Sequence, residues 1–153
     1  MNEQKVILSM VSVGRDPKDN LKKAVRLLNE FAELISISSV YRPIDQKGSL
    51  GLVTLVETNK SPEDFTTVIS ELRSTLDVIC YVLLFDGLVQ LNPDLPIPHP
   101  ELRNRAEWLV PASELWPDAI HPVLKKTLAE LVSNLEERPW GEFVAQGKSL
   151  LDF

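Results

Sequence analysis

The sequence predicts an α+β fold, in which helices pack on a mainly antiparallel sheet. Three observations support this: apolar runs of strand length, two amphipathic stretches at helical spacing between them, and a proline-led cap before each stretch. The chain has 153 residues, enough for one domain with a proper core and too few for two ordinary domains. We therefore expect a single domain over residues 1–153.

The first expected unit is a strand followed by a helix. Residues Lys5–Val13 are rich in Val, Ile, Leu and Met and are short enough for a buried strand. Asp16 then suits an N-cap and Pro17 the first helical position, with Asp19 completing an approximate capping box. The following apolar residues share one helical face: Leu21, Ala24, Val25, Leu28 and Phe31.

Two more strands and a second helix follow. Residues Leu34–Arg42 alternate as in a strand with one better-buried face, and Leu50–Thr58 forms another strand between turn residues. Ser61 and Pro62 repeat the cap-plus-proline device, with Asp64 at the third helical position. One face of this second helix carries Phe65, Val68, Ile69, Leu72 and Leu76.

A fourth strand over Val78–Phe85 completes the order βαββαβ. Two helices on one face of an antiparallel sheet in this order make a ferredoxin-like sandwich. Additional C-terminal helices are expected over about Arg105–Leu115 and within His121–Glu137, the second capped by Thr127. Residues 137–153 are weakly patterned, and we expect a loosely packed tail or one that docks elsewhere on the chain.

Composition and charge exclude several functions. The net charge is −6 and the basic residues are scattered, which argues against a nucleic-acid partner. Cys80 is the only cysteine, so the chain cannot form an internal disulfide or a Cys-based zinc site. No segment approaches membrane-spanning length, and the N-terminal apolar run is short and lacks a basic lead-in. We expect a cytoplasmic protein with no membrane partner.

Several stretches, taken in order, resemble one enzyme family. They are SSVYR at 38–42, LVTLVET at 52–58, TLD at 75–77 and PIPHPELRNRAEWLVPASELWPDAIHP at 96–122, continued by HPVLKKTLAELV. This series resembles the 6-hydroxymethyl-7,8-dihydropterin pyrophosphokinases of folate biosynthesis over nearly the whole chain. The resemblance implies a ferredoxin-like fold and pyrophosphate transfer from ATP to the hydroxymethyl group of a dihydropterin. It also implies two magnesium ions held by an Asp-x-Asp pair on a central strand.

The chain departs from this family at the metal pair. If TLD is matched, Asp77 takes the first acid and Ile79 stands at the second. If LLF at 83–85 is matched instead, Ile79 and Tyr81 replace the pair. Both registers put positions 77, 79 and 81 on one face of the strand. That face keeps at most one carboxylate, so Asp77 is a weak magnesium-ligand candidate.

Other family features are also missing. The first loop reads VSV at 11–13 where the family typically has Gly-Ser-Asn, and Gly51 aligns with the asparagine that reads the pterin. The long loop that closes over ATP is essentially deleted, because ISELRSTLD runs almost directly into the strand. Glu107 aligns with an aromatic residue that stacks on the pterin, and the adjacent Trp108 could substitute only after a local shift.

Some features implied by the resemblance survive. His99 matches a histidine near the nucleotide phosphates, Arg105 matches a phosphate-binding arginine, and Tyr41-Arg42 matches the start of the mobile second loop. Simpler interpretations stay open for each charged group. His99 also fits a loop histidine bonded to backbone, Arg105 fits ion pairing with nearby glutamates, and Asp77 fits an ordinary surface carboxylate.

The coincident losses favour a catalytically degenerate pyrophosphokinase-like protein that acts as a binding or interaction module. One alternative is an active pyrophosphokinase with a rearranged site, in which Asp77 works with Asp86 or a glutamate; magnesium and ATP are expected only in that case. Another is a small-molecule sensor, or a subunit that binds a protein partner, whose cleft holds a pteridine or another anionic small molecule. The phosphate- or ligand-binding candidates are His99, Arg105, Arg42, Tyr41 and Trp108.

Overall fold

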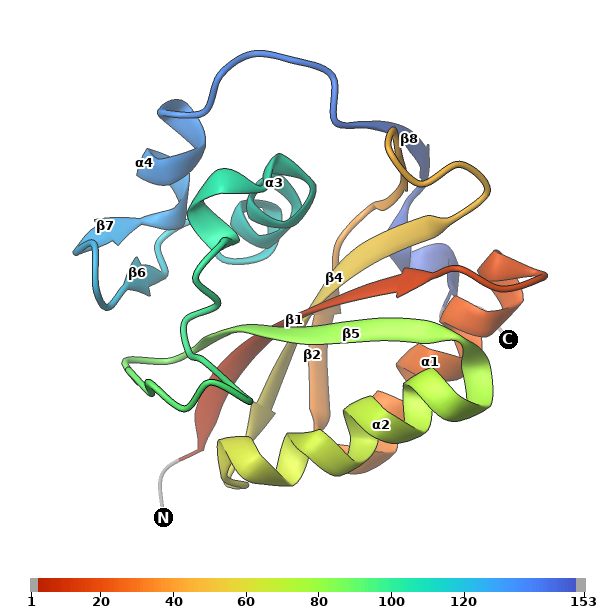
Figure 1. The fold of residues 1–153 in the computed structure, drawn as a ribbon, viewed down its shortest axis with the longest axis horizontal. Helices are drawn as coiled ribbons and strands as arrows, with labels where there is room; N and C mark the ends of the chain where they lie inside the picture. The colour runs from red at the N-terminus through yellow and green to blue at the C-terminus, as the bar shows by residue number, and fades with distance from the viewer. Residues whose placement is uncertain (1–2, 151–153) are drawn as a thin grey trace.

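The structure is a computed structural model that describes residues 3–150 (Figure 1). The strands are β1 (Gln4–Ser12), β2 (Glu33–Ile37), β3 (Val40–Pro43), β4 (Leu50–Thr58), β5 (Val78–Phe85), β6 (Ile120–His121), β7 (Lys126–Thr127) and β8 (Gly141–Ala145). The α-helices are α1 (Pro17–Phe31), α2 (Phe65–Leu76), α3 (Ala106–Leu115) and α4 (Leu128–Ser133). None of the helices in this part of the chain is long and apolar enough to cross a bilayer.

The main sheet has the order β5-β1-β4-β3-β8, and β2 also pairs with β4. Every pairing in it is antiparallel. Helices α1 and α2 lie on one side of the sheet, whereas α3 and α4 lie on the other (Figure 1). The predicted ferredoxin-like α+β fold is confirmed, with the additional C-terminal helices packed on the second face of the sheet.

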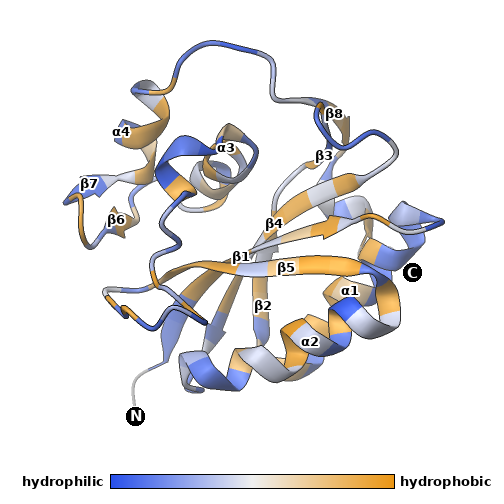
Figure 2. Cartoon of the chain, in the orientation of Figure 1, coloured by the Kyte–Doolittle hydropathy of each residue, from blue (hydrophilic) through white to orange (hydrophobic). Residues whose placement is uncertain are grey.

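Alternating side chains build a core on each face of the sheet. Leu8 and Met10 of β1 pack with α1 and α2, while Ile7 packs with α3 and α4. Figure 2 shows β5 as a largely hydrophobic strand between these layers. By the same alternation, Ser9 and Val11 lie on the α3 side, beyond the end of the second core. A site can therefore form on that face without interrupting the main core.

Asp16 is the N-cap of α1 and Pro17 its first residue, as predicted, but the expected side-chain cap is absent, whereas the predicted cap of α4 is confirmed. Asp16 has φ 53° and ψ 57°, and its side chain makes no capping hydrogen bond. An N-cap side chain reaches the first-turn N–H groups from extended backbone, which this left-handed conformation does not provide. At α4, the Glu130 N–H donates to Thr127 Oγ1 at 3.1 Å and the Thr127 N–H donates to Glu130 Oε1 at 3.2 Å.

The strand expected over Leu34–Arg42 is divided into β2 and β3 at Ser38 and Ser39. The Ser38 hydroxyl donates to the Ser39 carbonyl at 2.9 Å and accepts from the Val53 N–H at 2.9 Å. The Ser39 N–H donates to Glu114 of α3 at 2.8 Å. Side-chain hydrogen bonds here replace part of the strand ladder, which is how serine interrupts regular structure.

The C-terminal third differs most from expectation. The helix expected within His121–Glu137 is only Leu128–Ser133, because the β6–β7 hairpin, with Lys125 at φ 59°, takes the preceding residues. Part of the expected loose tail forms β8 on the edge of the sheet, and Leu150 is fully buried in the main core. Residues 151–153 of that tail lie outside the described residues.

Cys80 gives a direct test of the packing of β5. Its side chain is 3% exposed, and burial raises the pKa of the thiol to about 12. Because the thiolate is the reactive form, we expect a disulfide reagent at about pH 8 to modify Cys80 only as fast as the chain unfolds. The rate in a urea series should follow the unfolded fraction. Rapid stoichiometric modification of the folded protein would contradict this packing.

Candidate functional site

A cleft lies on the α3 side of the sheet, where β5, the β3–β4 loop and the start of α3 meet. Its outer part is a cavity of about 210 Å³. The residues that line it are Val11, Pro43, Asp45, Gln46, Ile79, Tyr81, Arg105, Glu107 and Trp108. Two of the ligand-binding candidates, Arg105 and Trp108, therefore share one cavity with two residues of β5.

The cleft-facing positions of β5 are Ile79 and Tyr81, which pair with Val11 and Ser9 of β1. Asp77 does not belong to the strand. It is the C-cap of α2, with φ 52° and ψ 38°, and its side chain is exposed and does not line the cavity. The cleft face of β5 thus presents Ile79 and Tyr81, and neither carries a carboxylate.

Three rings pack together at the edge of this cleft. The ring centroids of His99 and Trp108 are 4.7 Å apart, and that of Tyr81 is 5.3 Å from His99 and 5.4 Å from Trp108. The Arg105 guanidinium carbon is 4.5 Å from the Trp108 ring centroid, within the range of a cation–π contact. His99, Arg105 and Trp108, named separately from the sequence, therefore form one cluster with Tyr81.

His99 is held as a neutral side chain. Its Nδ1 accepts from the Glu101 N–H at 3.1 Å, which leaves the ring proton on Nε2. Burial lowers the pKa of His99; the nearby Glu101 raises it and Arg105 lowers it, and burial is the largest effect. At neutral pH the ring therefore offers one hydrogen-bond donor and no positive charge.

Arg105 supplies the positive charge of the cluster. It forms ion pairs with Glu101 at 3.1 Å and with Glu107 at 3.6 Å, and its side chain is 43% exposed. The interpretation of ion pairing with nearby glutamates is therefore confirmed. Exposed pairs of this kind are weak, so they do not prevent the guanidinium from turning to an anion in the cleft.

Tyr41 is oriented by a carboxylate from α3. Its hydroxyl donates to Glu114 at 3.1 Å, the same carboxylate that binds the Ser39 N–H. Burial, reinforced by the negative Glu114, raises the pKa of Tyr41. The ring packs on Trp140, with centroids 4.7 Å apart, while the neighbouring Arg42 is 3.7 Å from Glu142 in an exposed ion pair. Tyr41 and Arg42 thus contact the C-terminal segment.

The inner part of the cleft is almost filled. A cavity of about 20 Å³ remains. Its lining consists of Ser9, Met10, Val11, Tyr41, Pro43, Gly51, Leu52, Glu107, Trp108 and Trp140. It shares Val11, Pro43, Glu107 and Trp108 with the outer cavity, so the two are parts of one cleft. Trp140 was not predicted as a site residue; its only sequence signal is the strand-like GEFVA that follows it.

The side chains of the cleft do not fit a pair of magnesium ions. Among the residues that line the outer cavity, the carboxylates are Asp45 and Glu107, and Glu107 is paired with Arg105. Neither lies on β5. Magnesium prefers octahedral oxygen coordination that includes carboxylates, and the apolar Ile79 and the aromatic Tyr81 provide none.

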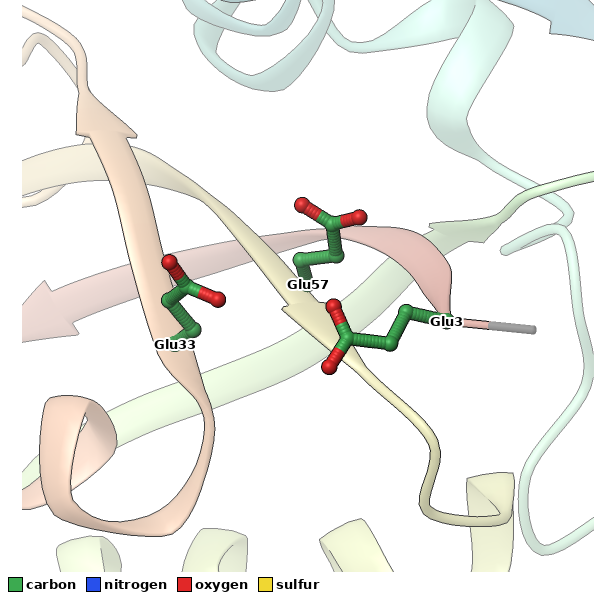
Figure 3. Close-up of side chains that lie close together, drawn as sticks. All are labelled: Glu3, Glu33 and Glu57. Carbon is green, nitrogen blue, oxygen red and sulfur yellow. The ribbon is translucent and has the colours of Figure 1, made fainter. Parts of the chain in front are cut away.

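A group of three carboxylates lies elsewhere. Ligand oxygens of Glu3, Glu33 and Glu57 lie within 4.8 Å of one another, with Glu33 on β2 and Glu57 on β4 (Figure 3). Two of them are exposed, and acidic groups often gather on a surface without an ion. Glu57 is six residues along β4 from Gly51, roughly 20 Å from the cleft. We assign no metal to this group.

Comparison with known proteins finds similarity in sequence and in structure. No protein-family model matches the chain. The 2-amino-4-hydroxy-6-hydroxymethyldihydropteridine pyrophosphokinase of Aquifex aeolicus (strain VF5) is 27% identical over 141 residues, which cover 82% of this chain and 88% of that protein. The crystal structure of wild-type Plasmodium falciparum HPPK-DHPS with STZ-DHP matches with a TM-score of 0.71 and 14% identity.

That match covers 87% of this chain and 42% of the Plasmodium chain. The same protein with pterin and p-hydroxybenzoate also gives a TM-score of 0.71, with 14% identity and 43% of its length covered. The chain thus spans less than half of these solved chains. At this identity they show the fold alone, whereas the Aquifex match covers most of both sequences. The chain therefore resembles a 6-hydroxymethyl-7,8-dihydropterin pyrophosphokinase in sequence over most of its length and shares the fold of the solved HPPK-DHPS chains.

Proposed function

We propose that this protein is a catalytically degenerate relative of the pyrophosphokinases that binds a pteridine-class heterocycle without transferring pyrophosphate. The observation that carries the proposal is the pair Ile79 and Tyr81 on the cleft face of β5. Two-metal phosphoryl transfer needs bridging cations to neutralise the triphosphate. Here the strand offers an aliphatic and an aromatic side chain, and the Tyr81 ring packs against His99 and Trp108.

A rearranged metal site using Asp77 and Asp86 has little geometric support. These two residues flank the eight residues of β5. At about 3.3 Å per strand residue, they are separated by roughly 30 Å. They cannot coordinate one ion or two adjacent ions together. The other acids at the cleft, Asp45 and Glu107, come from a loop and from an existing ion pair.

The cleft retains groups that suit a flat heterocycle. Tyr41 and Trp108 supply aromatic surfaces, and Trp108 is 4% exposed. Arg105 and the Nε2–H of His99 supply hydrogen-bond donors, one charged and one neutral. Small-molecule sites commonly combine an apolar, aromatic lining with a few such polar groups. A ring system with carbonyl and nitrogen acceptors, such as a pteridine, matches this set.

The first test is enzymatic. With ATP, magnesium and 6-hydroxymethyl-7,8-dihydropterin, we expect no AMP above the protein-free rate, because β5 provides no carboxylate pair. Asp77→Asn should behave as the wild type. AMP is measured by chromatography, with the Aquifex pyrophosphokinase as the positive control. Turnover that Asp77→Asn abolishes would show an active enzyme and refute the proposal.

The second test is binding of 6-hydroxymethylpterin, followed by thermal unfolding. A ligand at about 100 times its Kd stabilises the native state by about 2.7 kcal/mol, which raises Tm by several degrees in a chain of this size. Arg105→Ala should reduce this shift. The matched control is Arg73→Ala, a change at an exposed position of α2, and this variant should show the same Tm shift as the wild type. If no pteridine changes the wild-type Tm at millimolar concentration, the protein does not bind this class.

The third test concerns the neutral state of His99. Burial lowers the pKa of His99 and of His121, so the unfolded chain takes up protons first as the pH falls below about 6.5. The histidine contribution to the free energy of unfolding is therefore complete above about pH 6.5 and decreases as the pH falls toward the folded-state pKa values.

We expect the urea midpoint to decrease between about pH 7.5 and about pH 5.5. His99→Asn, which retains an acceptor for the Glu101 N–H, should lessen the decrease, and His121→Asn should lessen it separately. If the decrease is the same in His99→Asn as in the wild type, the neutral state of His99 does not contribute to it.

A further inference from the structure

We propose that the segment 134–145, here called the strap, is a lid on the cleft, and that Trp140 fills the inner part until a ligand displaces it. The strap runs from the end of α4 through β8. Figure 1 shows its first part as a long connection that arches from α4 to β8. This inference rests on the proposed function, since it concerns access to the same cleft.

Trp140 occupies the space that a ligand would need. Its ring lies 4.7 Å from that of Tyr41, and its carbonyl accepts from the Ile44 N–H at 3.1 Å. With the indole in place, the inner cavity is about 20 Å³, room for about one water molecule. A bicyclic heterocycle cannot enter between Tyr41 and Trp108 unless the indole leaves.

A buried polar atom faces the inner cavity. Ser9 is 1% exposed and lines the inner cavity. Its hydroxyl has no hydrogen-bond partner among the described residues. Leaving such a group unpaired costs about 1–3 kcal/mol, and a water molecule in the remaining space or a polar ligand removes that cost. A heterocycle with nitrogen or carbonyl groups at its edge would supply a partner for this hydroxyl once the indole has left.

The strap is anchored at both ends. Before it, Leu128 and Leu131 of α4 are buried in the core beside α3. After it, Leu150 is fully buried in the main core, and Gly147 packs so closely that an added Cβ would lie 1.9 Å from the Ser38 carbonyl oxygen. Opening of the strap therefore need not release either end.

Leu135 at the start of the strap packs against the second core, but few of the following side chains are buried. Residues 134–139 have little regular structure, and most are exposed; Figure 2 shows this connection as mainly hydrophilic. In β8, Phe143 is 57% and Val144 37% exposed. Among the residues that the structure describes, this strand pairs with β3 alone, through four residue pairs interrupted by a register shift.

A segment with exposed side chains and edge hydrogen bonds opens at a lower free energy than the whole chain. The same opening makes the apparent affinity of a ligand lower than its affinity for the open cleft. A ligand therefore binds only if its interactions in the inner cleft stabilise the complex by more than the free energy needed to open the strap.

Hydrogen exchange of the full chain tests the lid without any ligand. The β8 amides that pair with β3 should exchange at least tenfold faster than the amides of β4, and Leu150 should stay protected with the core. Exchange of β8 at the rate of β4 would mean that the strap opens only with global unfolding, which would overturn the proposal.

Calorimetry with 6-hydroxymethylpterin tests displacement. Trp140→Ala should bind at least tenfold more tightly than the wild type, because the plug is removed. The control Val144→Ala, an exposed change in the same strap, should bind as the wild type. Equal or weaker binding by Trp140→Ala would show that the indole supports the ligand or does not block it, and would overturn the proposal.

A reversible crosslink distinguishes the effect of holding the strap closed from the effect of changing its side chains. Arg42 and Glu142 are directly opposed in the β3–β8 pair, so Arg42→Cys with Glu142→Cys can join the strap to the sheet. The oxidised and reduced forms of this variant lack the same two side chains, so they differ only in the crosslink. The native Cys80 is buried, away from this pair. The oxidised form should bind at least tenfold more weakly than the reduced form; equal affinity would contradict the proposal. If no pteridine binds any of these proteins, the proposed function fails, and hydrogen exchange alone decides whether the strap opens.

Discussion

The alternation of side chains along β5 is the constraint on which the cleft depends. Val78, Cys80 and Val82 point into the core with α1 and α2, so the intervening positions must face α3. Ile79 and Tyr81 are therefore held at the cleft by the packing of their neighbours. A one-residue shift would move every core side chain to the wrong face. The chemistry available at this surface is fixed by the same pattern that stabilises the sheet.

A second set of interactions joins α3, the edge of the sheet and the C-terminal segment. Glu114 of α3 accepts from the Ser39 N–H and from the Tyr41 hydroxyl. These bonds form where β2 ends and β3 begins, and they orient the Tyr41 ring on which Trp140 packs. Tyr41 is thereby shared between a fixed helix and a segment that we propose to be movable. The Trp140 ring occupies the inner cleft because it packs on a Tyr41 ring that Glu114 holds in place.

Local patterns were sufficient for the fold but not for the closure of the cleft. The strands at Leu50–Thr58 and Val78–Phe85 matched the structure residue for residue, since apolar runs between turn residues determine them locally. The break at Ser38–Ser39 depends on Glu114, 75 residues away in sequence, which no local pattern reveals. Asp16 has a typical capping sequence, but its left-handed backbone prevents the side-chain bond.

In the candidate site, too, some residues could be predicted from the sequence and others depend on contacts between distant segments. His99, Arg105 and Trp108 could be named from the sequence because they stand in a recognisable series, and the structure places them in one cluster. The position of Trp140 could not be predicted, because it requires knowing which strand edge accepts a weakly patterned tail. The unpaired Ser9 hydroxyl was equally hidden, since only the packed sheet shows that no described residue bonds to it.

The most direct test of the central claim is a calorimetric titration of the protein with magnesium and a non-hydrolysable ATP analogue. Because Ile79 and Tyr81, the cleft-facing residues of β5, carry no carboxylate, we predict no saturable heat at millimolar nucleotide. Saturable, magnesium-dependent binding that is lost in Asp77→Asn or Glu107→Gln would show that the cleft still holds a metal–triphosphate complex, and would contradict the loss of two-metal chemistry from β5.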